Sequence, residues 1–205
     1  YQRNIEYVSA QEGPAAADVK NKLENLFITS KVASCENLLA LFTPRFEAEP
    51  DNAELASNIV KMLATSENCQ NNDLFLKAVT LMHKSDPSYS SAYYLYRLHS
   101  AKNEKDIATK YLEEAIKSEG IDPKTKADYT FELATYCLKN GNNGKAGEYA
   151  KQAADLDSEY QGRAYYIIGS IWGSVACGGN EIEKRAHFWV AVDYLNKAKA
   201  AGMKV

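Results

Sequence analysis

A spacing of small and large residues recurs in the second half of the chain and constrains the fold more than any other feature. An alanine is followed four positions later by a leucine or alanine, and three positions after that by another alanine, so all three share one helical face. The copies are Ala108, Leu112 and Ala115; Ala146, Ala150 and Ala153; and Ala191, Leu195 and Ala198. They begin 38 and then 45 residues apart, an interval typical of stacked helix pairs. The pattern therefore predicts an all-α helical repeat protein.

The composition favours a folded protein without a nucleic-acid partner. Hydrophobic residues make up 45% and charged residues 25% of the chain, as in ordinary globular proteins. Lys and Arg number 24 against 27 Asp and Glu, for a formal net charge of −3. Binding to a phosphate backbone leaves an excess of positive charge that is absent here. No run approaches the roughly 18 to 20 apolar residues that span a bilayer, so we expect no membrane span in this chain.

Proline and glycine breakers divide the chain into about five antiparallel helix pairs. Asp86-Pro87 and Asp122-Pro123 each stop one periodic segment before the next begins. Residues 1–14 carry little helical pattern and are interpreted as a lead-in segment. We expect one continuous repeat domain over residues 15–205, with pairs at approximately 15–49, 51–86, 88–121, 123–158 and 160–201.

The last helix has a distinct start and an apolar surface. Asn180 and Glu183 are three residues apart and resemble a capping box, which predicts that a long helix begins there and runs to about Ala201. Unless further chain covers this helix, we expect it to expose Phe188, Trp189 or Val190. Because the end of a repeat array needs a polar cap, we expect either an additional helix or self-association through this surface.

Residues 88–201 resemble the tetratricopeptide repeat. That family places a large residue, Leu-Gly and an aromatic on the first helix, and two alanines flanking a large residue on the second. The matching residues are Tyr165, Ile168, Gly169 and Trp172 in the fifth pair; Leu95, Ala108, Leu112 and Ala115 in the third; and Leu133, Ala134, Cys137, Ala146 and Ala153 in the fourth. Ala150 stands where a larger residue is usual, and the first two pairs lack the small residues. The resemblance implies a right-handed α-solenoid.

A narrower resemblance bears on localisation. The run from Cys177 to Lys197 is similar to a segment of tetratricopeptide proteins of Bacteroidetes bacteria. This would imply a periplasmic or cell-envelope protein of unknown function, with more chain after Val205; a cytoplasmic protein is the alternative. The chain begins at Tyr1 and not at Met, so we expect a processed form or part of a longer protein. The resemblance carries over no catalytic or binding residues.

The tetratricopeptide resemblance also implies a ligand groove. In that superhelix the first helix of each pair lines the concave side, where extended peptides are held. The corresponding residues here are Tyr93, Arg97, Phe131, Thr135, Tyr166 and Ser170. Aromatic rings bury a large area and Arg can bind a carboxylate with two hydrogen bonds, so this mixture suits a protein or peptide ligand. The Lys and Asn clamp of chaperone-binding members is absent at these positions, and the rings could instead pack between neighbouring helices.

The four cysteines do not predict a metal site. They stand at positions 35, 69, 137 and 177 without CxxC spacing, which argues against zinc and against a disulfide-rich scaffold. Cys35 and Cys69 lie near the start of the second helix in successive pairs, positions that stacking brings side by side. We hypothesise a disulfide between them; the alternative is two free thiols. Cys137 lies on an apolar helix face and is expected in the core.

No motif predicts catalysis. His83, His99 and His187 share no HExxH spacing, and the chain lacks GxSxG. The loop at residues 141–146 has its glycines too close for a phosphate-binding loop, and Ala146 replaces the required hydroxyl. We therefore expect no catalytic residues, no metal and no cofactor. The sequence favours a noncatalytic protein- or peptide-binding scaffold over a structural spacer in a larger envelope assembly, and an enzyme is least favoured.

Overall fold

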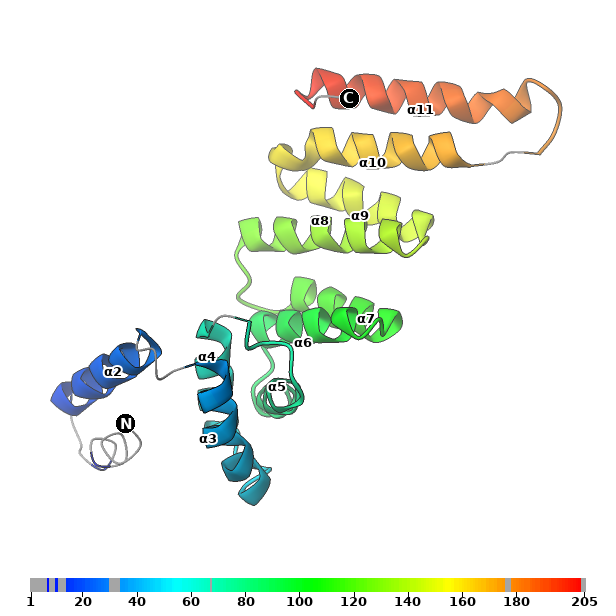
Figure 1. Cartoon of the computed structure of the whole chain (residues 1–205). Helices are drawn as coiled ribbons and strands as arrows, with labels where there is room; N and C mark the ends of the chain where they lie inside the picture. Colours follow the sequence, from blue (N-terminus) through cyan, green and yellow to red (C-terminus); the bar gives the residue numbers. More distant parts are fainter. Residues whose placement is uncertain are drawn as a thin grey trace. The chain divides into compact units, whose positions relative to one another are not determined.

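The computed structural model describes Tyr7, Ala10 and residues 14–29, 34–66, 68–175 and 178–203. The described residues form helices joined by short loops and contain no strand, so the predicted all-α class is confirmed. Contacts within the chain divide it into two compact units, Tyr1–Pro87 and Ser88–Val205. Figure 1 labels the helices of both units, and each unit is described by itself.

The first unit contains α2 (Pro14–Thr29), α3 (Cys35–Ala48), α4 (Ala53–Thr65) and α5 (Asp73–Ser85). α4 and α5 form a helical hairpin, and α3 packs against both. Asn52 and Asn72 begin the two hairpin helices, because each side chain accepts a hydrogen bond from a backbone N–H in the first turn. The fully buried side chains of this unit include Leu38, Ile59, Leu63, Phe75 and Val79. On α2, by contrast, Val19 and Leu26 are exposed.

A disulfide joins Cys35 to Cys69, the two cysteines paired in the sequence hypothesis. The S–S distance is 2.05 Å and the Cα atoms lie 5.2 Å apart. Cys35 is the first residue of α3, whereas Cys69 lies in the loop between α4 and α5 and is fully buried. The bridge therefore ties the start of α3 to the hairpin loop across a sequence separation of 34 residues.

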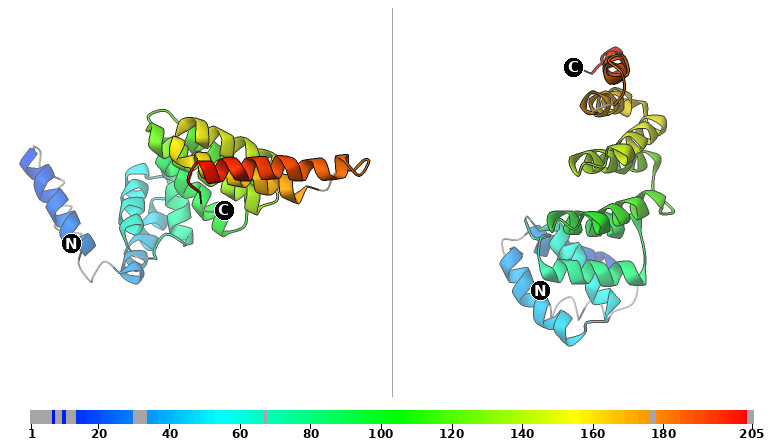
Figure 2. Two further views of the ribbon diagram at one scale, coloured as in Figure 1. Left: turned by 90° about the horizontal axis from the view of Figure 1, so that it is seen from above. Right: turned by 90° about the vertical axis from the view of Figure 1, so that its right-hand side faces the viewer.

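The second unit contains α6 (Tyr89–Ala101), α7 (Lys105–Lys117), α8 (Pro123–Lys139), α9 (Asn143–Leu156), α10 (Gln161–Ser174) and α11 (Glu183–Ala200), with a short 3-10 turn, η1 (Ser158–Tyr160). Each α-helix packs against the next in the sequence, from α6 to α11. The layers follow one another from green to red in Figure 1, and Figure 2 shows them from two further directions. The predicted packing of helices in consecutive pairs is confirmed.

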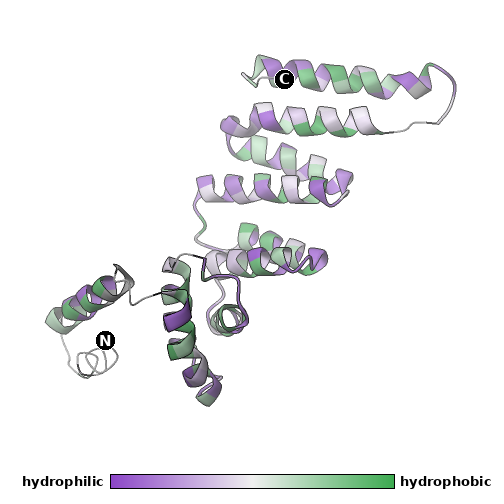
Figure 3. Cartoon of the chain, in the orientation of Figure 1, coloured by the Kyte–Doolittle hydropathy of each residue, from purple (hydrophilic) through white to green (hydrophobic). Residues whose placement is uncertain are grey.

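The recurring small residues form the helix contacts of this unit. The three motif alanines of α9, Ala146, Ala150 and Ala153, and both alanines of α7 are fully buried, and on α11 Ala191 and Ala198 are buried too. Ala108, Leu112 and Ala146 share one core with Leu133 and Cys137. Figure 3 shows apolar and hydrophilic residues alternating along each helix, as expected when one face packs and the other meets water.

Local capping sets the helix boundaries that the sequence predicts. Asp122 begins α8, because its carboxylate accepts the backbone N–H of Thr125 at 2.9 Å and Pro123 opens the first turn. Before α11, the backbone N–H of Asn180 donates to the Glu183 carboxylate at 2.8 Å. The Asn180 side-chain oxygen accepts the Glu183 N–H at 3.0 Å in return. The reciprocal bonds expected between Asn180 and Glu183 are therefore present, although α11 itself begins at Glu183, with Ile182 as its N-cap.

Glycine lets α10 approach α11 closely. A Cβ atom built on Gly169 would lie 3.1 Å from both the Ala191 carbonyl oxygen and the Leu195 Cγ. One built on Gly162 would lie 3.3 Å from the Ala201 carbonyl oxygen. These contacts are tighter than ordinary packing allows, so α11 can lie at this distance only because both positions lack a side chain.

Candidate functional site

The six predicted groove residues lie on the first helices of three consecutive pairs, and we call them the first-helix row. Each helix contributes two residues spaced four apart, which places both on one helical face. Tyr93 and Arg97 lie on α6, Phe131 and Thr135 on α8, and Tyr166 and Ser170 on α10. The row therefore runs across α6, α8 and α10 within the second unit.

Tyr93 connects two of these helices. Its hydroxyl donates a hydrogen bond to Glu132 Oε2 at 2.9 Å, and its ring stacks on that of Tyr129 with centroids 4.2 Å apart. Burial, followed by the hydrogen bond to Glu132, raises the pKa of the Tyr93 hydroxyl well above its usual value. Tyr93 is thus a packing residue between α6 and α8 as well as a member of the row.

Phe131 lies in an aromatic cluster with Arg163, a residue that was not predicted from the sequence. Its ring stacks on Tyr160 at 4.7 Å between centroids, and the Tyr160 hydroxyl donates to Asp128 Oδ1 at 2.6 Å. The Arg163 guanidinium carbon lies 5.8 Å from the Phe131 centroid and 5.4 Å from that of Tyr160. Such distances allow cation–π attraction, which holds the exposed Arg163 side chain in place.

The other members of the row are more accessible. Arg97 and Thr135 are exposed, Tyr166 retains 41% of its accessible surface, and Ser170 is half-buried. The Thr135 hydroxyl donates to the Glu132 carbonyl oxygen of its own helix. The row thus combines two packed rings, Tyr93 and Phe131, with polar and aromatic side chains that a ligand could reach.

A hollow of about 540 Å³ lies between α9, α10 and α11. Its walls are mostly apolar. The lining residues include Gly147, Lys151, Ile168, Trp172, Val175 and Tyr194. Trp172 matches the repeat motif in the sequence, whereas the sequence predicts no role for Gly147 or Lys151. Gly147 was the available sequence signal for the hollow. A glycine inside a helix leaves space where a side chain would otherwise pack against the neighbouring helices.

The last helix carries an exposed apolar surface. Phe188 retains 51% of its accessible surface, Trp189 62% and Val192 53%, whereas Val190 is half-buried. The predicted exposure of Phe188 and Trp189 is therefore found, and Val192 extends the surface by one helical turn from Phe188.

Neither a family model nor a curated protein matches this sequence. Two crystal structures of MamA, a helical repeat protein of the tetratricopeptide type, are similar in fold. The first is 20% identical, over 82% of this chain and 88% of the other, with a TM-score of 0.56. The second is 21% identical, over 82% of each chain, with a TM-score of 0.57. The chain has a tetratricopeptide-type fold. At this identity the similarity concerns the fold alone.

Two of the three histidines lie in the second unit, on different helices: His99 on α6 and His187 on α11. His99 Nδ1 forms a hydrogen bond with Glu104, and its ring stacks on Tyr111 at 5.4 Å. His187 is buried on α11, with its ring 3.9 Å from that of Phe188. Within the described ranges, no cluster of three or more His, Cys, Asp or Glu side chains could hold a metal ion. None of the helices described there is long and apolar enough to cross a membrane. Cys177 lies outside the described residues.

The tyrosines that join neighbouring repeats predict a loss of stability in alkaline solution. Burial and the hydrogen bond to Asp128 raise the pKa of Tyr160 to about 12, and burial with nearby acidic groups raises the pKa of Tyr129 to about 12. Because an unfolded tyrosine ionises near pH 10, this stabilisation is complete below about pH 10 and is lost as the pH rises through about 12. We expect the urea midpoint to fall as the pH rises from about 10 to about 12.

The Tyr160→Phe variant separates this effect from general alkaline repulsion. Its midpoint should fall less steeply with pH than that of the parent chain, because the ionising hydroxyl is gone. Absorbance at 295 nm, read in the same samples, should show tyrosines that ionise only as the protein unfolds. Parallel midpoint curves for the two proteins would contradict the prediction.

Proposed function

We propose that this chain is a noncatalytic scaffold that binds a protein or peptide along the first-helix row. The observation that carries the proposal is the placement of Arg97, Phe131 and Tyr166 on one row across three consecutive first helices. A tetratricopeptide-type fold suggests protein interaction in general. The row identifies the surface on which we expect the ligand to lie.

The side chains of the row suit an extended peptide that carries a carboxylate. Arg97 and Arg163 form no ion pair with any residue in the part of the chain that the structure describes. Arg163 is held against two rings, which reduces the side-chain entropy lost when it binds. A guanidinium can donate two parallel hydrogen bonds to a carboxylate, and the exposed Tyr166 ring offers apolar area beside it.

A site-specific photocrosslinker tests the proposal. Benzoylphenylalanine at position 135, an exposed point of the row, should capture a partner from cells that make this protein. The same group at Lys110, which is exposed on α7, serves as the control. The Arg97→Glu and Tyr166→Ala variants should each reduce capture at position 135 by about 10-fold. Matched variants on the second helix, Lys110→Glu and Ile107→Ala, should leave capture unchanged.

Two outcomes would count against a ligand on the row. Equal capture from positions 135 and 110 would show that the row has no preference for the partner. Capture at position 135 that survives both row variants would favour a structural spacer, in which the solenoid separates other domains and the row itself is unoccupied.

We propose an oxidising compartment such as the periplasm or cell envelope for this chain. The support is the Cys35–Cys69 disulfide, because structural disulfides persist outside reducing compartments. Trapping free thiols with an alkylating reagent before cell lysis provides the test. Modification of Cys35 and Cys69 in cells alkylated before lysis would contradict this localisation.

A further inference from the structure

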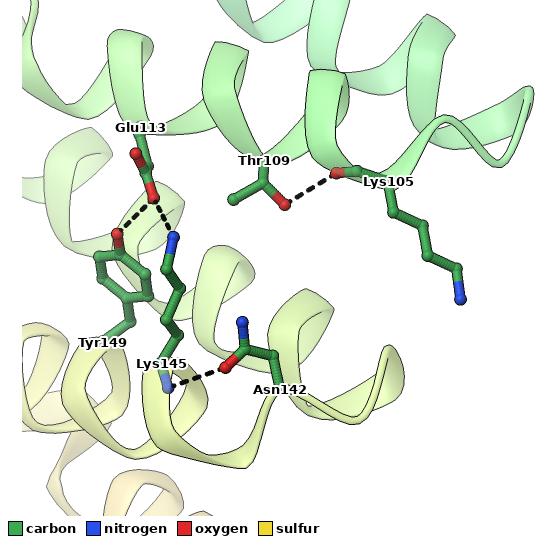
Figure 4. Close-up of polar contacts among 6 residues, drawn as sticks. All are labelled: Lys105, Thr109, Glu113, Asn142, Lys145 and Tyr149. Carbon is green, nitrogen blue, oxygen red and sulfur yellow. Dashed lines mark hydrogen bonds and ion pairs between the residues drawn. The ribbon is translucent and has the colours of Figure 1, made fainter.

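A polar contact joins the second helices α7 and α9. Glu113 Oε1 accepts a hydrogen bond from the Tyr149 hydroxyl at 2.7 Å and another from Lys145 Nζ at 3.1 Å (Figure 4). Burial favours the neutral carboxyl, but the hydrogen bonds from Tyr149 and Lys145 outweigh it and lower the pKa of Glu113. The carboxylate is therefore the acceptor for two donors of the following repeat, and we call these three residues the polar tie.

Tyr194 on α11 is a hydrogen-bond donor at the position that corresponds to Tyr149 on α9. In the tie, Tyr149 stands three residues after Ala146, the first alanine of the recurring motif in α9. Tyr194 stands three residues after Ala191, the corresponding alanine of α11. The two tyrosines therefore occupy equivalent positions on successive second helices.

The acceptor, by contrast, has been replaced. Glu113 stands five residues after Ala108 on α7, and the residue five positions after Ala146 on α9 is Lys151. Both Lys151 and Tyr194 line the hollow between α9, α10 and α11. A carboxylate at the position of Lys151 would complete a second polar tie. With Lys151 at this position, two donors, Lys151 and Tyr194, line the hollow without the carboxylate that Glu113 supplies between α7 and α9.

The two donors have no acceptor elsewhere in the described ranges of the chain. The Tyr194 hydroxyl makes no hydrogen bond and Lys151 forms no ion pair with any residue there. The Tyr194 ring is held by Tyr165, at 6.1 Å between centroids, and by Lys197 Nζ, at 5.0 Å from its centroid. Glu148 is the one acidic side chain among the lining residues, on the same helix as Lys151. Besides Glu148, the charged groups that line the hollow or contact the Tyr194 ring are Lys151 and Lys197.

Most of the rest of the hollow is apolar, with Asn143 and Glu148 as its other polar lining residues. Ile168, Trp172 and Val175 of α10 line it, and Trp172 keeps 40% of its accessible surface. Gly147 on α9 leaves room, because even a Cβ there would first meet Ile171 Cδ1, at 3.8 Å. At about 540 Å³ the volume lies within the range of small-molecule sites, roughly 300 to 1,000 Å³.

We propose that this hollow binds a small molecule that carries one carboxylate on an apolar ring or chain. The carboxylate accepts hydrogen bonds from Tyr194 and Lys151, as Glu113 does from Tyr149 and Lys145. The apolar part lies against Trp172 and Ile168. This site is separate from the first-helix row and does not depend on a peptide binding there.

Titration calorimetry with 4-phenylbutyrate tests the proposal, and 4-phenylbutanamide is the matched neutral probe. We expect saturable 1:1 binding of the acid with a Kd of about 1 mM or lower, the range open to a ligand of this size. The amide should bind at least about 10-fold more weakly, since it lacks the charge that Lys151 and Tyr194 recognise. Equal affinity for acid and amide, or no heat from the acid up to about 10 mM, would overturn the proposal.

Three variants locate the binding. Lys151→Glu supplies an internal acceptor for Tyr194 and repels the ligand, so it should abolish binding while the urea midpoint stays the same or rises. Tyr194→Phe should weaken binding by about 10-fold, and Gly147→Leu should fill the hollow. Lys110→Glu, an equal charge change on α7, should bind like the parent chain. Unchanged affinity in a folded Lys151→Glu protein would contradict the assignment.

Two further measurements distinguish binding in the hollow from binding on the first-helix row and from binding of a protein partner. The Arg97→Glu and Tyr166→Ala variants should bind 4-phenylbutyrate normally, so a failure of the row leaves this result intact. A short peptide that ends in phenylalanine with a free carboxylate should compete no better than 4-phenylbutyrate. Displacement at a concentration at least about 10-fold lower would overturn the small-molecule assignment in favour of a protein partner.

Discussion

Reduction of the Cys35–Cys69 disulfide is expected to lower the free energy of unfolding of residues 1–87 by about 3 to 4 kcal/mol. The bridge joins residues 34 apart in the sequence, and closing a loop of this length removes conformational freedom mainly from the unfolded chain. A loss of this size is a large fraction of the 5 to 15 kcal/mol that typically stabilises a domain. It should therefore be visible as a clear shift of the urea transition.

The two units can be followed separately because both tryptophans, Trp172 and Trp189, lie in residues 88–205. Circular dichroism reports the helices of both units, whereas tryptophan fluorescence reports the second unit. We expect reductant to shift the circular dichroism transition to lower urea and to affect fluorescence less. A Cys35→Ser, Cys69→Ser variant is the control, since reductant should not change its midpoint. Coincident transitions of the parent chain with and without reductant would contradict the prediction.

Replacing Gly169 by valine is expected to loosen α11 from α10. The first added carbon would already lie 3.1 Å from the Ala191 carbonyl oxygen and from the Leu195 Cγ, and the two methyl groups of valine extend further. Since the backbone of α11 cannot yield as a flexible side chain could, the helices must separate. Overpacking of this kind costs about 1 to 3 kcal/mol, which should appear in the stability of the last helix pair.

Hydrogen exchange measured by mass spectrometry checks this result. Amides of residues 183–200 should exchange roughly 10-fold faster or more in Gly169→Val, while those of α6 and α7 should change little. Gly173→Ala is the matched control on the same helix. Its Cβ would meet the Ala191 Cβ at 3.7 Å, an ordinary contact, and alanine is the better helix former. Equal protection of α11 in Gly169→Val and the parent chain would show that the contact can relax.

Features set by neighbouring residues were predicted well from the sequence. The start of α11 follows from Asn180 and Glu183, which satisfy each other's backbone groups within one turn. The second and third copies of the small-residue motif mark the buried faces of α9 and α11, because a helical face depends only on the spacing of its residues. Cys35 and Cys69 could be paired because stacked hairpins bring the starts of successive second helices together.

The candidate site was predicted less completely. The spacing of Tyr93 and Phe131 places them on the first-helix row, yet only the structure shows that Tyr93 bonds to Glu132 and that Phe131 stacks on Tyr160. Arg163 was missed because its role comes from rings on two other elements. The contacts of Tyr93 with Glu132 and of Phe131 with Tyr160 and Arg163 join residues more than 25 positions apart. Periodicity along one helix does not indicate which side chains of different helices come into contact.

The sequence by itself determined the helical class, the helix boundaries and the faces that pack, since these depend on capping and on spacing along a single helix. Tertiary structure alone decided how side chains from different helices fill the space between them. The difference between Glu113 on α7 and Lys151 at the corresponding position of α9 is an example. In the sequence, Lys151 is one charged residue on a helix surface. Between the stacked helices, however, Lys151 occupies the position that corresponds to the acceptor Glu113 of the preceding repeat, and it lines the hollow together with Tyr194. Its meaning depends on distances that only packing fixes.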